Sequence, residues 1–336
     1  MTLHSTSRSQ AGFSLPELLI SVTVLLIISS AVTSALLQMT SSQRTIWNRT
    51  QLHAGVRSAT ELLQQEVGQA GKISLPGVVT LSAAVAGPGA ATVGVRVDGA
   101  VPATMTGFFV GEKLVVDVGG PTPCVPVTPC QETVTVTAVN TAAKQITATF
   151  AYPHFVNTPV NAFGGFGSGI VPPLAGGFAN GSTASVLKLY GDINGDGTLV
   201  YVEYTCDPAP GGTGNLYRNV MPYDQAPPKA APTTGQILLT NIQTNPGGTA
   251  CFTYMPNPLP VVVNPAGIGE SYVLDVAITL TVNTQVIDPI TRQFQTETKA
   301  LLNVSPRNVF NVWQLASAGV AERVQPMPPS VVALLP

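Results

Sequence analysis

The feature that most constrains this chain is an uncharged apolar segment near its N-terminus, from Leu18 to Leu37. Twenty helical residues at a rise of roughly 1.5 Å each span about 30 Å, the thickness of the hydrocarbon core of a bilayer. A secretory signal would place a small-residue cleavage site after the apolar run, whereas residues 39–43 continue directly into a helical pattern. A plain membrane anchor gives no reason for Glu17 to stand at the start of the segment, because an ionisable group there is unfavourable without a partner.

Residues 8–20 read RSQAGFSLPELLI and resemble the type IV prepilin signature. That signature is a glycine, then an aromatic or apolar residue, then a glutamate at the fifth position counted from it; here these are Gly12, Phe13 and Glu17. The resemblance implies a leader of residues 1–12, which prepilin peptidase removes before the new Phe13 amine is methylated. It also implies that Glu17 pairs with the Phe13 amine of a neighbouring subunit, which agrees with the need of a buried carboxylate for a cationic partner. The leader departs from the family pattern in carrying a single firm positive charge.

The helical pattern continues beyond the apolar run. Gly68 and Gly71, followed by Pro76, predict where it stops. We therefore expect one helix, with residues 13–38 in the membrane or filament core and residues 39–70 amphipathic and packed on a sheet. The apolar positions of its second half, three or four residues apart, are Leu52, Val56, Ala59, Leu63 and Val67.

The remainder of the chain has the composition of a β protein. The 32 glycines and 29 prolines of the whole chain are concentrated after residue 75, among many threonines and valines, which favours short strands joined by turns. Residues 76–180 are low in charge and are expected to be an insertion, with a compact β module at about residues 100–160. Within this module, strands are expected at residues 108–117, 133–139 and 145–150.

Residues 181–310 are expected to form the pilin-type β-sheet domain, and residues 311–336 a C-terminal tail. The order of the predicted strands in residues 185–310 resembles that of larger minor pilins and of J-type pseudopilins of type II secretion. The expected fold class is α+β: a long N-terminal helix packed on an antiparallel sheet, with an inserted small β module.

The four cysteines contain no CxxC pair, and three histidines are too few and scattered to complete a zinc site with them. An even number in a β-rich chain fits disulfides formed outside the cytoplasm, with four buried free thiols as the alternative. We favour pairing Cys124 with Cys130 and Cys206 with Cys251, although four cysteines allow three pairings.

Residues 192–203 match the EF-hand calcium-loop expression. The following stretch reads as a strand, however, and at about 3.3 Å per residue it carries Glu203 roughly 16 Å beyond Thr198, too far to close a cage around an ion. Two alternatives remain: a partial calcium site filled out by water, or an Asn-Gly and Asp-Gly turn between two strands that needs these residues for positive φ. The candidate calcium ligands are Asp192, Asn194, Asp196 and Thr198.

Charge and motifs exclude several classes of function. Only 10% of residues are charged and the net charge is -2, so no basic surface points to nucleic acid. The chain contains no HExxH, GxSxG, GxGxxG or Walker motif, which argues against an enzyme.

The resemblance implies a minor pilin that helps to prime, assemble or cap a type IV pilus, with a type II secretion pseudopilin as the alternative. Its implied partners are other pilins or pseudopilins, prepilin peptidase and the inner-membrane assembly platform. Before assembly the chain would cross the inner membrane once, with its β domain in the periplasm or outside the cell; afterwards it would lie in a pilus or pseudopilus. From a different class, a membrane-anchored adhesin or calcium-responsive binding module would use the insertion as its binding face.

Overall fold

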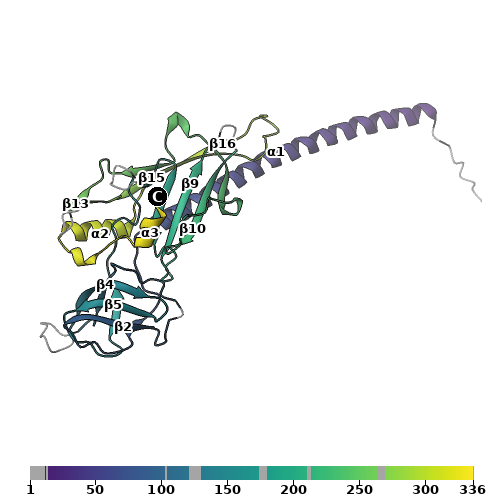
Figure 1. Cartoon of the computed structure of the whole chain (residues 1–336). Helices are drawn as coiled ribbons and strands as arrows, with labels where there is room; N and C mark the ends of the chain where they lie inside the picture. The colour runs from purple at the N-terminus through teal and green to yellow at the C-terminus, as the bar shows by residue number, and fades with distance from the viewer. Residues whose placement is uncertain are drawn as a thin grey trace, which may run out of the picture. The chain divides into compact units, whose positions relative to one another are not determined.

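The computed structural model describes residues 12, 14–102, 104–120, 130–173, 180–209, 213–263 and 269–335. One long helix is followed by two groups of strands and a C-terminal segment with two short helices (Figure 1). The described residues fall into two compact units: one joins the helix up to Gln51 with Thr284–Gln295, and the other holds Leu52–Asn283 and Thr296–Pro336. The predicted α+β class is confirmed.

The helix α1 is continuous over 55 residues, Leu15–Gln69. It ends where Gly71 takes φ +79°, a left-handed conformation that favours glycine. A Cβ at this position would also lie 2.7 Å from the carbonyl oxygen of Phe166. Both the backbone conformation and this close contact therefore favour glycine. The predicted apolar stripe is buried in the core that α1 shares with the main sheet, at Val56, Ala59, Leu63 and Val67.

The main sheet is entirely antiparallel and has seven strands, in the order β12-β15-β11-β10-β9-β8 with β16 paired to β15. One strand, β15, pairs with β12 along one part, with β11 along another, and with β16 along nearly its whole length. The strands are β8 (Val186–Gly191), β9 (Val200–Asp207), β10 (Gly214–Pro222), β11 (Ile237–Gln243), β12 (Phe252–Met255), β15 (Asp275–Asn283) and β16 (Thr296–Val304).

Between α1 and this sheet the chain forms a closed barrel in the order β1-β2-β5-β4-β3-β6, with β1 paired back to β6. Closure leaves no unpaired edge and encloses a core of valines, leucines and aromatic side chains. The carboxylate of Glu132 accepts the backbone N–H groups of Ala151 and Tyr152 and contacts buried His154 at 2.7 Å. The strands are β1 (Val79–Leu81), β2 (Gly89–Val97), β3 (Lys113–Val116), β4 (Glu132–Asn140), β5 (Gln145–Phe150) and β6 (Pro159–Ala162).

The barrel differs from the expected module in where it begins and in one strand. It starts at Val79 rather than near residue 100, because the three-residue β1 pairs with β2 on one side and with the distant β6, through Val160, on the other. The strand expected at residues 108–117 is shortened to β3, since Gly107 and Gly111 take φ +96° and +95° and turn the chain before it.

The C-terminal segment is ordered rather than a loose tail. Gln325 exchanges hydrogen bonds with the backbone of Lys113, at 2.9 and 2.8 Å, and so ties the segment to the barrel. Val331 and Leu334 are buried in one apolar cluster with Tyr190 of β8. The elements are α2 (Arg307–Ser317), η4 (Ala321–Arg323), β17 (Val324–Gln325), which runs parallel to β7 (Gly165–Phe166), and α3 (Pro329–Leu334).

Candidate functional site

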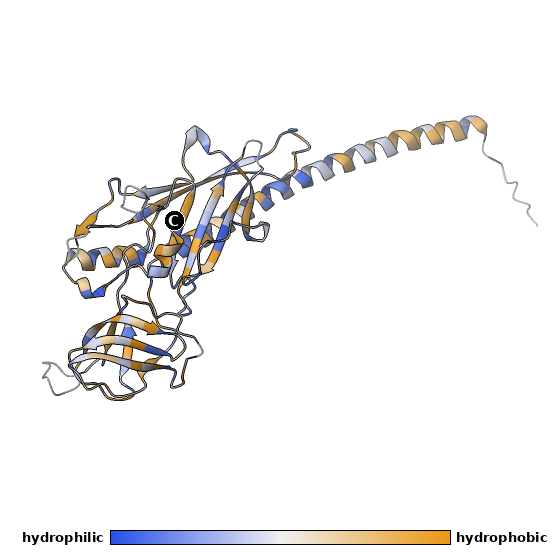
Figure 2. Cartoon of the chain, in the orientation of Figure 1, coloured by the Kyte–Doolittle hydropathy of each residue, from blue (hydrophilic) through white to orange (hydrophobic). Residues whose placement is uncertain are grey.

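The N-terminal half of α1 is the most exposed apolar surface of the described chain. Every described residue from Ser14 to Thr40 is exposed, and α1 is long and apolar enough to cross a membrane (Figure 2). Hydroxyls within the segment bond back to the helix's own carbonyls, as Ser21 does to Glu17 at 2.8 Å and Thr23 to Leu19 at 2.8 Å. Such bonding satisfies polar groups inside the helix, which a helix surrounded by hydrocarbon requires.

Glu17 lies in the first turn of this helix, which begins with the amides of Glu17 and Leu18 donating to the Ser14 carbonyl at 3.0 and 3.1 Å. Its side chain is exposed, and within the described part of the chain no ion pair or side-chain hydrogen bond engages its carboxylate. Gly12 is also exposed, and a Cβ there would meet nothing within 4 Å. Phe13 lies outside the described residues, so its cleavage, its methylation and its pairing with Glu17 remain predictions.

At the other end of α1, Glu66 is buried at the face that packs on the sheet. Arg218 of β10 donates Nε to its two oxygens at 3.0 and 3.2 Å and Nη2 to Oε1, and the Tyr204 hydroxyl donates to Oε2 at 2.5 Å. Burial disfavours the charge on Arg218, but its bonds to Glu66 outweigh this and raise its pKa. This cluster fastens the exposed helix to the globular domain. In the sequence, the signal for this cluster was the carboxylate of Glu66, which stands beside Leu63 and Val67 on the apolar stripe.

Residues 7–33 match the prokaryotic N-terminal methylation motif. The chain is type IV prepilin-like. Proteins with this motif are structural pilins and pseudopilins that prepilin peptidase processes and that assemble with one another. No curated protein and no solved structure matches the chain, so the motif and the geometry of α1 carry the assignment.

The calcium-like loop of this prepilin-like chain is held by protein groups. Asp192 is fully buried; Lys72 Nζ lies 3.0 Å from its Oδ2, Ser74 donates to the same oxygen, and the Asp196 amide donates to Oδ1 at 3.0 Å. Asp196 in turn accepts the Thr198 amide at 2.8 Å. Burial alone would raise the pKa of Asp192, but Ser74 and Lys72 outweigh it and hold the pKa below its usual value.

Asp192, the first candidate calcium ligand, is thus ion-paired with Lys72, and calcium binding at this loop remains a prediction. Gly195 and Gly197 take φ +75° and +80°, the conformation that the turn alternative requires. Glu203, expected not to be a ligand, bonds instead to the Tyr201 hydroxyl at 2.6 Å and to Lys229. The arrangement is that of a turn between two strands.

Cys206 of β9 and Cys251, just before β12, form a disulfide in the core beneath the main sheet. This is the pairing that we favoured from the sequence. Cys130 is also disulfide-bonded. Cys124 lies outside the described residues, so the pairing of Cys124 with Cys130 remains a prediction.

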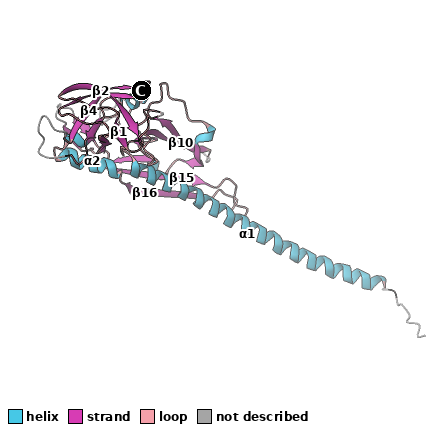
Figure 3. Ribbon diagram, turned by 90° about the horizontal axis from the view of Figure 1, so that it is seen from below, coloured by secondary structure: helices cyan, strands magenta, loops and turns pink. Residues whose placement is uncertain are grey.

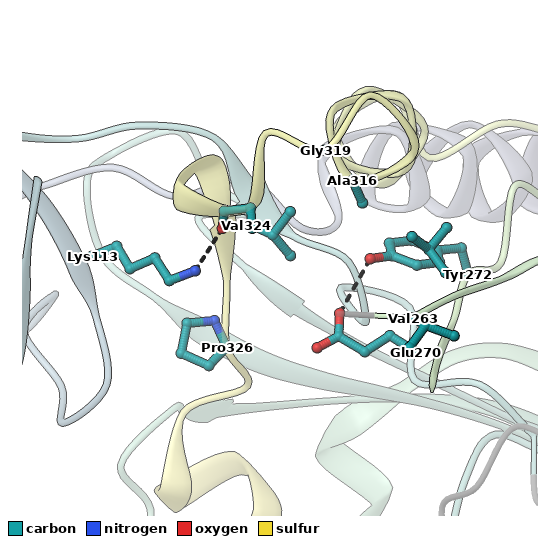
Figure 4. Close-up of a pocket in the computed structure, with 10 residues that line it drawn as sticks. Lys113, Val263, Glu270, Tyr272, Ala316, Gly319, Val324 and Pro326 are labelled. Atoms are coloured by element: carbon teal, nitrogen blue, oxygen red, sulfur yellow. Dashed lines mark hydrogen bonds between the residues drawn. The ribbon is translucent and has the colours of Figure 1, made fainter. Parts of the chain in front are cut away.

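A cavity of about 500 Å³ lies between β3, the β13–β14 hairpin (Val261–Val263 and Gly269–Ser271) and the end of α2 (Figure 4). Lys113 and Glu270 stand on opposite walls of it. Lys113 Nζ donates to the Ala321 carbonyl at 2.6 Å, and the Tyr272 hydroxyl donates to Glu270 at 3.1 Å. Burial lowers the pKa of Lys113, while Glu270 and Glu322 partly offset this. Both charges are thus engaged by protein groups, and the space between them is mainly apolar.

One further carboxylate escaped the sequence interpretation. Glu112, just before β3, is completely buried, and neither of its oxygens has a hydrogen-bond partner. Burial raises its pKa well above the ordinary value; the nearby Phe109 amide, outside hydrogen-bonding geometry, offsets this only in part. Its position between two runs of three apolar residues, Phe108-Phe109-Val110 before and Leu114-Val115-Val116 after, was the signal that could have identified it.

Proposed function

We propose that the chain is a minor pilin, a low-abundance subunit that primes, assembles or caps a type IV pilus. The observation that carries this is the exposed, uncharged half of α1, which directly follows a methylation motif and carries the lone Glu17. The 26 consecutive positions from Leu15 to Thr40 are all exposed. So large an apolar surface is unfavourable in water and needs to be covered by lipid or by other helices. A pilin subunit uses both environments in turn.

The mechanism follows from charge and burial. Removal of residues 1–12 would free the Phe13 amine, a cation at the start of the apolar helix. When helices bundle, Glu17 loses its hydration and is unfavourable unless that amine of a neighbour reaches it. The pair would therefore set the axial register of subunits, while the apolar side chains around it supply most of the association free energy.

The size of the globular part favours a minor role. A complete six-stranded barrel is inserted between α1 and the main sheet, whereas an abundant repeating subunit is usually more compact. A type II secretion pseudopilin uses the same helix chemistry and is the alternative within this class; neighbouring genes would separate the two.

A membrane-anchored binding module is the alternative of a different class, and the cavity beside Lys113 and Glu270 is the observation that favours it. Deleting residues 79–162 tests it. Filaments that form but have lost their activity would favour the binding module, whereas lost assembly would favour the pilin. Deleting only residues 100–160 would leave β1 and β2 without their partners β6 and β5.

The assembly proposal is tested by substitutions in one helix. We expect Gly12→Ala to leave residues 1–12 attached, as measured by intact mass, and to abolish piliation or secretion. We expect Glu17→Ala to be processed normally but to fail in assembly. Glu61→Ala is the matched control, because Glu61 is an exposed carboxylate of α1 bonded to Arg57 within the helix. Full complementation by Gly12→Ala or Glu17→Ala would overturn the proposal.

A further inference from the structure

The hairpin that joins β15 to β16 exposes an apolar face. Val286 is 61% exposed, Ile287 49%, Ile290 60% and Phe294 44%, all within twelve residues. Scattered apolar residues are ordinary on a protein surface, but four on one short hairpin form a patch, which marks an interaction site.

The one carboxylate of the same hairpin is buried, whereas its other polar residues are mostly exposed: Gln285, Thr291, Arg292 and Gln293. Asp288 is 1% exposed, and its Oδ1 accepts the amides of Ile290 and Thr291 at 2.7 and 3.0 Å, while Gln295 donates to Oδ2. The Thr284 amide donates to the Gln295 carbonyl at 2.9 Å and closes the base of the hairpin. The hairpin is therefore a folded unit in which Asp288 is internally hydrogen-bonded, while four apolar side chains and Arg292 are exposed.

This hairpin lies along α1, in the same compact unit (Figure 3). Arg49 Nε donates to Gln295 Oε1 at 2.9 Å, and the Thr45 side chain is within hydrogen-bonding reach of Asp288. The base of the hairpin is thus level with Arg49, and its tip is one helical turn closer to the N-terminus of α1. The tip points toward the apolar half of the helix.

The distance to that apolar half is short. The exposed apolar side chains of α1 continue to Met39, and Thr45 lies six residues beyond it, about 9 Å along the helix. The headgroup layer of a bilayer is about 5–8 Å thick on each side of its hydrocarbon core, so the level of Thr45 lies at the outer surface of that layer. Ile46 and Trp47, at the level of the tip, are 65% and 71% exposed, and tryptophan is enriched at membrane interfaces.

The charges around this patch have one prevailing sign. Arg44, Arg49 and Arg292 are exposed, while the only carboxylate in residues 39–51 and 284–295, Asp288, is buried within the hairpin. Exposed arginines beside an apolar face are complementary to anionic lipid headgroups, which attract each such charge.

We propose that, before assembly, this hairpin docks its apolar face against the headgroup surface of an anionic bilayer, so that the chain touches the membrane at both α1 and the β15–β16 hairpin. The inference rests on the proposed function, because it requires α1 to be inserted. A second membrane contact would hold the hairpin against the lipid surface and restrain rotation of α1 before the subunit joins the filament.

The test uses the full-length chain in nanodiscs of phosphatidylethanolamine and phosphatidylglycerol, at one chain per disc. An environment-sensitive fluorophore is attached to Ile290→Cys, to Ile27→Cys within the span, and to Phe155→Cys in the barrel, three exposed positions; every described native cysteine is already in a disulfide. Nitroxide lipids then report contact. We expect the fluorophore at position 290 to be quenched at least roughly twofold more than the fluorophore at position 155. We also expect quenching at position 290 to be weaker in discs of phosphatidylcholine alone than in the anionic discs.

The outcomes separate the two proposals. Loss of quenching at position 27 would show that α1 is not inserted and would overturn the proposed function itself. Quenching at 27 with none at 290 would overturn only the hairpin contact. A blue shift at 290 without lipid quenching, seen only with several chains per disc, would assign the patch to a second copy and overturn the lipid surface. Equal quenching in the anionic and zwitterionic discs would overturn the role of charge.

Discussion

Arg218 on β10 holds both carboxylate oxygens of Glu66 on α1 across a sequence separation of 152 residues. The assembly helix and the globular domain are therefore joined by a directed charge pair in addition to the apolar stripe. In a filament, force on the globular domain would pass to α1 through this contact.

We expect Arg218→Met to lower the free energy of unfolding by about 3 kcal/mol, because it leaves the buried Glu66 carboxylate without its cation. The effect lies at the low end for a buried pair, since the Arg218 side chain is 27% exposed. Urea unfolding of the detergent-solubilised chain measures it. The control, Arg57→Met, removes a solvent-exposed pair with Glu61 on the same helix and should leave the stability unchanged. Equal effects of the two substitutions would contradict the role of Glu66.

Glu112 should make stability depend on pH. Its pKa is raised in the folded state, so its favourable contribution is complete below the ordinary carboxyl pKa of 4.5 and is lost progressively as pH rises above that value. We expect Glu112→Gln to be more stable than the native chain at pH 8.5, by on the order of 1 kcal/mol or more, and nearly equal to it at pH 4. Thermal unfolding across this range is the measurement; parallel pH profiles of the two proteins would refute the prediction.

The Cys206–Cys251 disulfide closes a loop with a sequence separation of 45. Replacing both cysteines by alanine should lower the free energy of unfolding by about 3–4 kcal/mol, mainly because the unfolded chain gains freedom. Denaturant unfolding under oxidising conditions checks this. A loss below about 1 kcal/mol would mean that the crosslink contributes little beyond the packing of the core.

We expect calcium to leave the thermal stability of the protein unchanged. Because Lys72 neutralises Asp192, we expect millimolar Ca²⁺ not to shift the midpoint of thermal unfolding, and Asp192→Ala to be destabilising with or without calcium. Asp196→Ala, which removes one hydrogen bond to the Thr198 amide, should have a smaller effect. A calcium-dependent increase in the midpoint that both substitutions abolish would restore the metal site.

Local pattern was sufficient for the elements whose contacts are close in sequence. The apolar run from Leu18 and the stripe ending at Val67 predicted α1 almost to the residue, since a helix satisfies its backbone within itself and its periodicity is visible in any stretch of chain. The same holds for β4 and β5, adjacent strands with alternating apolar residues.

The sequence pattern was insufficient for elements whose pairing partner is distant in the chain. The barrel begins at Val79, which pairs with Val97 on one side and with the distant Val160 on the other, and a three-residue strand has too little periodicity to be recognised alone. The calcium-like loop matched its expression residue by residue, yet the motif gave no sign that Lys72, more than a hundred residues earlier in the chain, forms an ion pair with Asp192.

The sequence by itself determined that the chain has a prepilin-type N-terminus, a helix able to cross a membrane and a β-rich remainder, because those properties depend on neighbouring residues. Only the tertiary structure decided which charges are buried and with what partner: Glu66 with Arg218, Asp192 with Lys72, and Glu112 with none. Burial is created by the packing of distant segments, and it changes the free energy of a charge far more than any neighbour in sequence does.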